Sequence, residues 1–290
     1  MILAQTATEC SWGYRLIRSE RGDKPVVVNG PGSGELGFEL FNWATKSRTL
    51  AKRFKSEGKH VVQLGYIGRH PMYEEADEFW GYKSLSYPWT MQPEMKTLLY
   101  ETFPGFRFGT TKCHQLQPSF APLEPSAGAL AWAKNYCKDT PSLVIVCPRW
   151  KKEDRSFVRN FRYWPDVFDG IKDAKVVACV TKDQSVSLPC DYIEDLVGIN
   201  DMVDCEAALF RLADCTILGD SGVMALAACS GAMMVQYCQV STELDAFYNS
   251  LKTAFPNLGT DRIIAETDVD KMVEAARSCF GKRADCRMSV

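Results

Sequence analysis

The chain has 290 residues, of which 46% are hydrophobic, 24% charged and 11% aromatic, and its formal net charge is -2. This is a globular composition with room for two domains, and the charge balance gives no sign of a surface built as a whole for nucleic acid or membrane. No apolar run approaches the roughly 20 residues of a membrane-spanning helix, and the first residues lack the apolar core of a signal peptide. The twelve cysteines form no Cys-x-x-Cys pair. We therefore predict free thiols in a cytoplasmic protein.

The first half of the chain alternates between strand-like and helical patterns. VVVNG at 26–30 predicts a strand, residues 35–56 carry apolar side chains at helical spacing, and HVVQLGYIG at 60–68 predicts a second strand. Between residues 70 and 115 the pattern loosens and aromatic residues are frequent, so we expect irregular insertions and short helices there. LQPSFAPLEPSAG at 116–128 is rich in Pro, Ser, Gly and Ala and predicts a linker.

A second α/β series follows the linker. Helices are predicted over 128–138, from Pro165 onward, and over 205–213, 222–231 and 268–280, and strands over 142–148, 175–181, 215–220 and 232–238. Strands separated by helices imply parallel sheets with right-handed crossovers. We therefore expect an α/β protein of two Rossmann-like domains, 1–125 and 126–290, that face each other across a cleft.

The loop after the first predicted strand contains a GxGxxG pattern, formed by Gly32, Gly34 and Gly37. A dinucleotide site also needs an acidic residue at the end of the second strand, where it holds the ribose hydroxyls. VVQLGYIG ends without one, and Glu57 lies before that strand. An NAD(P) oxidoreductase is therefore the weakest of the alternatives.

The same loop can serve a different ligand. Gly32, Ser33 and Gly34 allow close backbone approach, and the helix that follows begins with free N–H groups. Glu35 falls in the first helical turn, where the helix dipole favours a carboxylate. Two interpretations stay open here, a capping acid in a tight turn and a functional carboxylate at the mouth of the cleft.

The most specific pattern is RLADCTILGDSGVMALAACSGAMMVQY at 211–237. A predicted strand ends in Asp220-Ser221-Gly222, and a helix rich in small residues begins at once. The backbone N–H groups of Ser221 and Gly222 then lie at a helix N-terminus beyond the carboxyl end of a parallel strand, where open α/β sheets bind ligands and especially phosphates.

This stretch resembles the donor-binding motif of the ADP-heptose:lipopolysaccharide heptosyltransferase family, in which a strand ends in D-S-G-x-x-H-L-A-A. Ala225 replaces the histidine of that motif. The family also has a strand ending in Pro and a basic residue shortly before a Trp-Pro pair. Here Pro148 ends a strand and Arg162 precedes Trp164-Pro165.

The resemblance implies a divergent GT-B glycosyltransferase, a hexosyl- or pentosyltransferase that uses a nucleotide-diphosphate sugar without a cofactor or metal. Arg162, helped by Arg149 or Lys152, and the amides of Ser221 and Gly222 would then stabilise the leaving diphosphate. Thr181, Lys182 and Asp220 would complete the donor site. Glu194 and Asp195 are either ribose or base contacts or a solvated acidic turn.

Gly34-Glu35 stands where the family has Gly-Asp, so the resemblance implies that Glu35 is the general base for the acceptor hydroxyl. GELGFELFNW is also similar to a loop of glycosyltransferase-like proteins of phages and bacteria. Two acceptors stay open, a glycan or lipid-linked sugar and a hydroxymethylated pyrimidine in phage-type DNA. The aromatic residues of 70–110 and Arg107, Lys112 and His114 either contact the acceptor or, for most of the aromatics, pack in the core.

A non-catalytic protein that binds sugar-nucleotide or nucleic acid on the same fold is the main alternative, because Ala225 replaces the family histidine. The sequence leaves open the sugar, the nucleotide, the stereochemical outcome and the oligomeric state.

Overall fold

A computed structural model describes residues 7–10, 13–30, 36, 39–82, 93–110, 122–150, 161–199, 201–219, 221–237 and 263–282. The chain divides into two compact units. Unit 1 comprises residues 1–121 and 199–203, and unit 2 comprises residues 122–198 and 204–290. The division at 121/122 lies within the stretch that the sequence analysis assigns to a linker.

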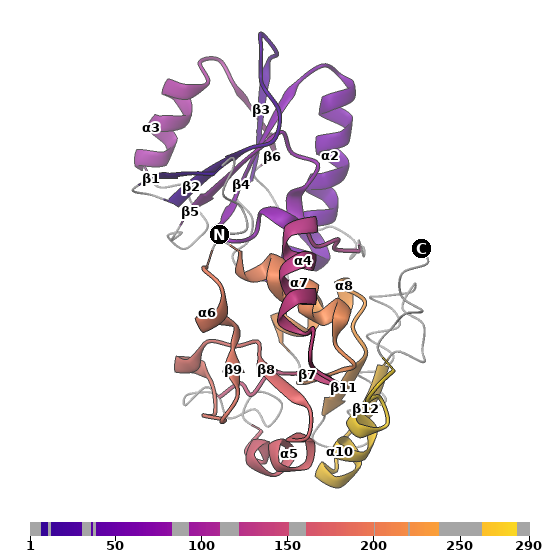
Figure 1. The fold of residues 1–290 in the computed structure, drawn as a ribbon. Helices are drawn as coiled ribbons and strands as arrows, with labels where there is room; N and C mark the ends of the chain where they lie inside the picture. The colour runs from indigo at the N-terminus through magenta and orange to yellow at the C-terminus, as the bar shows by residue number, and fades with distance from the viewer. Residues whose placement is uncertain are drawn as a thin grey trace. The chain divides into compact units, whose positions relative to one another are not determined.

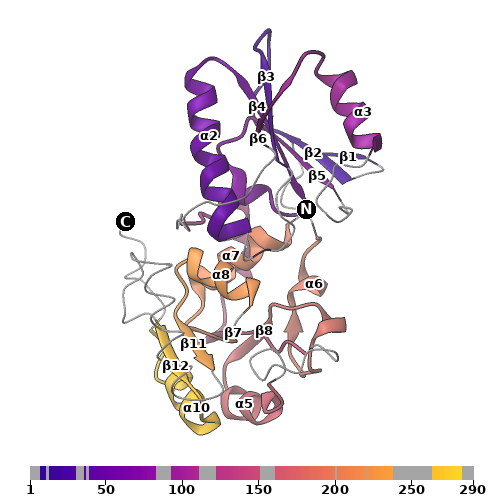
Figure 2. The ribbon, with the colours of Figure 1, turned by 180° about the vertical axis from the view of Figure 1, so that it is seen from behind.

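Unit 1 is a mixed sheet with helices on both faces (Figures 1 and 2). Its strands are β1 (Ala7–Cys10), β2 (Gly13–Ile17), β3 (Val26–Asn29), β4 (His60–Tyr66), β5 (Glu78–Tyr82) and β6 (Arg107–Thr110). Its helical elements are η1 (Glu39–Ala44), α2 (Thr45–Ser56), η2 (His70–Tyr73) and α3 (Pro93–Thr102). The strand order is β1-β2-β5-β4-β3-β6.

The alternation of side chains along the strands places one core on each face of this sheet. Val28 and Trp80 pack with Leu99 of α3 and with Phe103, the residue that follows this helix, in the larger core. On the other face, Val61 packs with Ala51 of α2 and with Ala76. The two helices therefore cover opposite faces, as Figure 1 shows.

Part of this sheet corrects the expectation of parallel strands. The pairs β3/β4, β4/β5 and β3/β6 are parallel, but β1/β2 and β2/β5 are antiparallel. Residues 70–115 also contain β5, α3 and β6 rather than only irregular chain and short helices. β5 has the sequence EFWGY and is buried along its whole length, so it lacks the polar–apolar alternation that marks a half-exposed strand.

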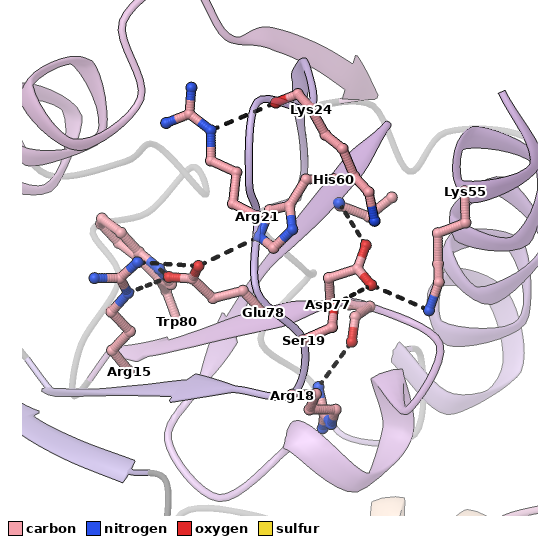
Figure 3. A network of polar contacts seen from close by, with 12 residues as sticks. Arg15, Arg18, Ser19, Arg21, Lys24, Lys55, His60, Asp77, Glu78 and Trp80 are labelled. Carbon is pink, nitrogen blue, oxygen red and sulfur yellow. Dashed lines mark hydrogen bonds and ion pairs between the residues drawn. The ribbon is translucent and has the colours of Figure 1, made fainter. Parts of the chain in front are cut away.

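Two acidic residues anchor the amino edge of this sheet (Figure 3). Asp77 accepts hydrogen bonds from the Val61 backbone N–H at 2.9 Å and from Ser19 Oγ at 2.6 Å, and Lys55 Nζ lies 3.2 Å from it. Glu78 accepts from Trp80 Nε1 and Arg15, and His60 Nε2 lies 3.5 Å away. These contacts join β2, β4, β5 and α2 at one point, which stabilises the antiparallel addition of β2.

Unit 2 is a six-stranded sheet in the order β12-β11-β10-β7-β8-β9, and all of its strand pairs are parallel. The strands are β7 (Leu143–Val146), β8 (Lys175–Ala178), β9 (Asp191–Tyr192), β10 (Cys215–Leu218), β11 (Met234–Tyr237) and β12 (Ile263–Glu266). The helices are α4 (Ala127–Tyr136), α5 (Trp164–Ile171), η4 (Lys182–Gln184), α6 (Ile193–Leu196), α7 (Met202–Leu212), α8 (Gly222–Cys229) and α10 (Val269–Arg277).

The helices of unit 2 form two layers around this sheet (Figures 1 and 2). α5 and α10 pack together, and Arg277 Nε donates to the Gly170 carbonyl at 2.6 Å. On the other side, two helices are linked: Ser126 caps α4 and donates from Oγ to Asp204, in the first turn of α7, at 2.6 Å. The four strands and five helices predicted for this half are all present. β9 and β12 are additional.

We expect Asp77→Asn to lower the free energy of unfolding by about 1–3 kcal/mol, because it weakens three interactions at a side chain that is almost fully buried. Urea denaturation measures this change. Glu75→Gln is the matched control, since its ion pair with Lys52 is at the surface and contributes little. An equal loss in both variants would contradict the anchoring role of Asp77.

The same acids predict a pH dependence of stability. Burial opposes ionisation of Asp77 and Glu78, but the hydrogen bonds and cations around them outweigh it and hold both pKa values below the usual range. A carboxyl group whose pKa is lowered by folding stabilises the fold above its unfolded pKa, near 4, and that contribution is lost as the pH falls through the folded pKa. Below about pH 4 the melting temperature should therefore decrease as the pH falls, and this decrease should be less steep in Asp77→Asn.

Candidate functional site

The strand order of unit 2 reverses beside β7. β8 and β9 follow on one side of β7, and β10, β11 and β12 lie on the other. Ligands of open parallel sheets bind beyond the carboxyl ends of the strands at such a switch point. Here β7 runs into Cys147, Pro148 and Arg149, and β10 runs toward Ser221 and α8.

Ser221 is the N-cap residue of α8, and its side chain accepts a hydrogen bond from the Met224 backbone N–H. The helix packs closely on the sheet because Ala225, Ala227 and Ala228 are all fully buried. Its first N–H groups lack partners within the helix and point toward the carboxyl edge of the sheet, where they suit an anion.

The Ser221 hydroxyl also contacts the thiol of Cys147, so the ends of β10 and β7 are joined at this point. The Cys147 N–H donates to the Ile217 carbonyl at 3.0 Å. Burial raises the pKa of Cys147 to about 12, so the thiol stays protonated and acts as a neutral neighbour of Ser221. The sequence analysis did not single out this cysteine.

Arg149 follows Cys147 in a rigid segment. Its N–H donates to the Cys147 carbonyl at 2.8 Å, and residues 148–150 pair with residues 184–186 through Val186 N–H to Pro148 O at 2.8 Å and Trp150 N–H to Gln184 O at 2.7 Å. Burial raises the pKa values of Cys147 and Tyr237, and the Arg149 charge acts against that rise in both. The guanidinium therefore lies close to both groups.

The half-buried Arg149 has no ion pair with any carboxylate in the described part of the chain. Arginines that pack against protein usually pair with an acid. Glu206 also acts on Cys147, but it forms no ion pair with Arg149 among the described residues. A guanidinium on the segment that follows the central strand suits an anion, and its fork of N–H donors suits a phosphate.

Arg162 lies two residues before Trp164, the first residue of α5, and is exposed. Its guanidinium stacks on the Tyr163 ring at 4.9 Å and donates to the Tyr163 hydroxyl at 2.7 Å. The neighbouring Phe161 stacks on Tyr237 with ring centroids 4.5 Å apart. Tyr163, Phe161 and Tyr237 form a series of ring contacts, with Arg162 on the Tyr163 ring and Arg149 near Tyr237. Arg149 is the less exposed of the two arginines.

Lys182 and the acidic turn are paired with each other. The Lys182 N–H donates to Glu194 at 2.9 Å, and Lys182 Nζ lies 2.6 Å from Asp195. Thr181 precedes η4 and its carbonyl accepts from Gln184 N–H at 3.0 Å. These four polar groups line the loop after β8, next to the segment that carries Arg149.

The remaining predicted site residues, Gly32, Ser33, Gly34, Glu35, Lys152 and Asp220, lie outside the described residues. For the predicted acceptor aromatics, the structure selects the core alternative where it describes them. Tyr73, Phe79, Trp80 and Tyr82 are buried in unit 1 and cannot stack on a ligand, whereas Phe108 is 38% exposed. Arg107 is also exposed, and Lys112 and His114 lie outside the described residues.

Within the described ranges, no cluster of three or more His, Cys, Asp or Glu side chains could hold a metal ion. No helix of the described chain is long and apolar enough to cross a membrane. Eight cysteines of the described ranges are free thiols: Cys137, Cys147, Cys179, Cys190, Cys205, Cys215, Cys229 and Cys279.

Solved structures with the same fold are glycosyltransferases. ADP-heptose lipopolysaccharide heptosyltransferase II of E. coli matches with a TM-score of 0.50 and 12% sequence identity over 88% of this chain and 98% of its own. A glycosyl transferase family 9 protein of Veillonella parvula matches with a TM-score of 0.48 and 13% identity over 90% of this chain and 98% of its own. No protein-family model and no curated protein sequence matches.

The likeness to the E. coli heptosyltransferase confirms the predicted α/β fold of the GT-B class, and it confirms at the level of fold the resemblance seen in the Asp220-Ser221-Gly222 motif. The two structures align over almost the whole of both chains, so the likeness covers both units. The motif that carries the resemblance thus falls at the switch point of unit 2.

We expect Ser221→Ala to lower the free energy of unfolding by about 1 kcal/mol, because it removes the N-cap of α8. Ser221→Thr keeps a hydroxyl at the cap and should lose less than half of that amount. Urea midpoints measure both changes. Ser278→Ala is the control, since its hydroxyl is exposed and bonds only locally, and a similar loss there would contradict the capping role of Ser221.

Proposed function

We propose that the protein is a glycosyltransferase that moves a sugar from a nucleoside-diphosphate sugar to an acceptor hydroxyl. The observation that carries this proposal is the guanidinium of Arg149, which has no ion pair within the described part of the chain and lies with Ser221, the N-cap of α8, around Cys147 at the switch point of unit 2. The E. coli structure of the same fold is named for ADP-heptose, which is a donor of this class.

The donor diphosphate occupies the space between Arg149 and the N–H groups of α8. As the bond to the sugar breaks, negative charge builds up on the diphosphate, and preorganised positive groups lower the energy of that transition state. Arg149 and the amides of Ser221 and Gly222 are such groups, and they require no metal ion. Arg162 is the second cation, and it must leave the Tyr163 ring to reach the diphosphate.

The nucleoside extends over the loop after β8. Thr181, Glu194 and Asp195 supply hydroxyl and carboxylate oxygens that suit the ribose hydroxyls, and Lys182 is held by the same acids. Trp150, 40% exposed, lies on the adjoining segment and offers an aromatic face to the base.

Glu35 is the general base that deprotonates the acceptor hydroxyl, an assignment that rests on its place in the glycine-rich loop after β3. The acceptor is a sugar of a glycan or lipid-linked glycan, or the hydroxymethyl group of a modified pyrimidine in DNA. The reaction belongs in the cytoplasm, where nucleotide sugars serve as donors and cysteines stay reduced.

A thermal-shift panel of UDP, GDP, ADP, CMP and dTDP sugars, with NAD(H) and NADP(H) beside them, tests the donor class. A ligand that binds only the folded chain raises its melting temperature by mass action. We expect one nucleoside diphosphate and its sugar to stabilise the chain. Stabilisation by NAD(P) alone would overturn the transferase in favour of an oxidoreductase.

The cations can be ranked with single variants. We expect Arg149→Met to weaken binding of the stabilising nucleoside diphosphate by about 10- to 100-fold, the range for a lost charge-assisted hydrogen bond, measured by calorimetry. Arg162→Met should weaken it less, because that side chain is exposed and stacked on Tyr163. Arg211→Met, which removes an ion pair with Glu124 in the same unit, is the control and should leave binding unchanged.

Glu35→Gln separates a transferase from a binding protein. If Glu35 is the base, the variant keeps donor binding and loses transfer by about 100-fold or more, the usual contribution of a general base. Release of nucleoside diphosphate in the presence of acceptor measures the rate. Donor binding without turnover in the wild-type chain would favour the non-catalytic alternative.

A further inference from the structure

The sheet of unit 1 has a switch point of its own. The parallel strands β4 and β5 lie on one side of β3, and β6 lies on the other. The last residue of β3 is Asn29, and Thr110 at the end of β6 is its partner. Asn29 therefore lies at the carboxyl end of the central strand of unit 1. In unit 2, the segment with Cys147 and Arg149 follows the corresponding strand end.

A β-bulge shapes this point. The pairing steps from Val28 with Phe108 to Asn29 with Thr110, so that Gly109 is an extra residue in β6. A Cβ atom on Gly109 would lie 2.3 Å from Asn29 Oδ1, a distance at which the two atoms clash. The missing side chain at 109 thus makes room for the Asn29 amide, and bulges beside functional sites often aim a side chain in this way.

The Asn29 amide has no hydrogen-bond partner among the described residues. Its side chain is fully buried, and neither Oδ1 nor Nδ2 is bonded to any group in that part of the chain. Its neighbour in the sheet provides a direct contrast. Gln63 pairs with Asn29 across β3 and β4 and is equally buried, but Ser47 Oγ donates to its Oε1, and its Nε2 donates to the Leu64 carbonyl at 2.8 Å.

An unpaired buried amide destabilises a fold, because the groups lose their bonds to water and gain none. An apolar residue of the same shape would avoid that cost. The same sheet supplies a partner to both polar atoms of the Gln63 amide, so the architecture does not by itself prevent pairing. The missing partner of Asn29 is then best supplied by a ligand.

We propose that Asn29 is an acceptor-binding residue that holds a hydroxyl group of a sugar acceptor, an inference that rests on the proposed transferase function. A hydroxyl donates to Oδ1 or accepts from Nδ2, and a sugar presents several hydroxyls besides the one that reacts.

The position agrees with the chemistry required. Asn29 directly precedes the glycine-rich loop that carries Glu35, the proposed base. The chain leaves β3 at Gly30 with φ of 104°, and a Cβ there would lie 2.6 Å from the Leu64 carbonyl, so the backbone after Asn29 is held tightly against β4. An acceptor hydroxyl bound to the Asn29 amide would therefore be held by the end of a rigid strand and not by a loop.

The experiment compares Asn29→Leu with Gln63→Leu, two substitutions that replace an amide by an apolar side chain on neighbouring strands. The probes are methyl glycosides of glucose, galactose and mannose, with nucleoside-diphosphate release as the readout. We expect Asn29→Leu to keep or raise the melting temperature, to keep the thermal shift caused by the donor, and to raise the KM for the glycoside by about tenfold or more. Gln63→Leu should lower the melting temperature and keep that KM.

Asn29→Ala repeats the test in case the leucine does not fit. A wild-type KM in the folded Asn29 variants would overturn the assignment, and so would the failure of every glycoside to accelerate release by the wild-type chain. A lower melting temperature of both variants with unchanged KM would show that Asn29 is structural. Failure of the proposed function is seen separately, as the absence of any donor-induced thermal shift in the wild-type chain.

Discussion

The reversal of strand order beside a central parallel strand is the constraint on which both candidate sites depend. β3 in unit 1 and β7 in unit 2 have parallel neighbours on both sides, and the chain moves outward from each of them first in one direction and then in the other. At such a point the connections leave the sheet in opposite directions, which opens a crevice beyond the carboxyl ends of the strands. Polar groups placed there remain available to a ligand while the rest of each strand is buried.

The treatment of arginine in the two units shows how this constraint acts. In unit 1, Arg15 pairs with Glu78, and Arg69 pairs with the fully buried Glu39. Glu39 also accepts from the Tyr73 hydroxyl, so its pair with Arg69 belongs to the core. Arg149 has no such acid among the described residues, and unlike Arg21, which also lacks one and packs over the Phe103 ring, it follows the central strand of its sheet.

The regular part of the fold could be predicted from the sequence because its signals are local. β7, β10 and α8 each show an apolar run or a small-residue run with a turn residue at the end, and the structure has all three at the predicted places. β1 and β2 escaped prediction because they depend on partners far away in the chain: β2 pairs with β5, and Arg15 needs Glu78. The tertiary environment decides such strands more than their own composition.

The candidate site also contains residues that local sequence signals predict and contacts that depend on residues far apart in the chain. Ser221 and Gly222 were predicted because a strand-to-helix turn carries its own N–H groups, whatever surrounds it. The ranking of Arg149 above Arg162, the contact of Ser221 with Cys147 and the unpaired amide of Asn29 depend on which side chains meet across the sheet. Glu35 and Asp220 stay predictions, because they lie outside the described residues.

Ala225 shows where this chain departs from the family it resembles. The motif of that family has histidine at this position, and here a fully buried methyl group fills it, on a helix that packs closely against the sheet. A contact from that imidazole to the donor is therefore absent. The guanidinium of Arg149, on the loop after the neighbouring strand β7, brings a permanent charge to the same edge of the sheet. On the proposed function, Arg149 and the backbone N–H groups of α8 recognise the diphosphate without that imidazole.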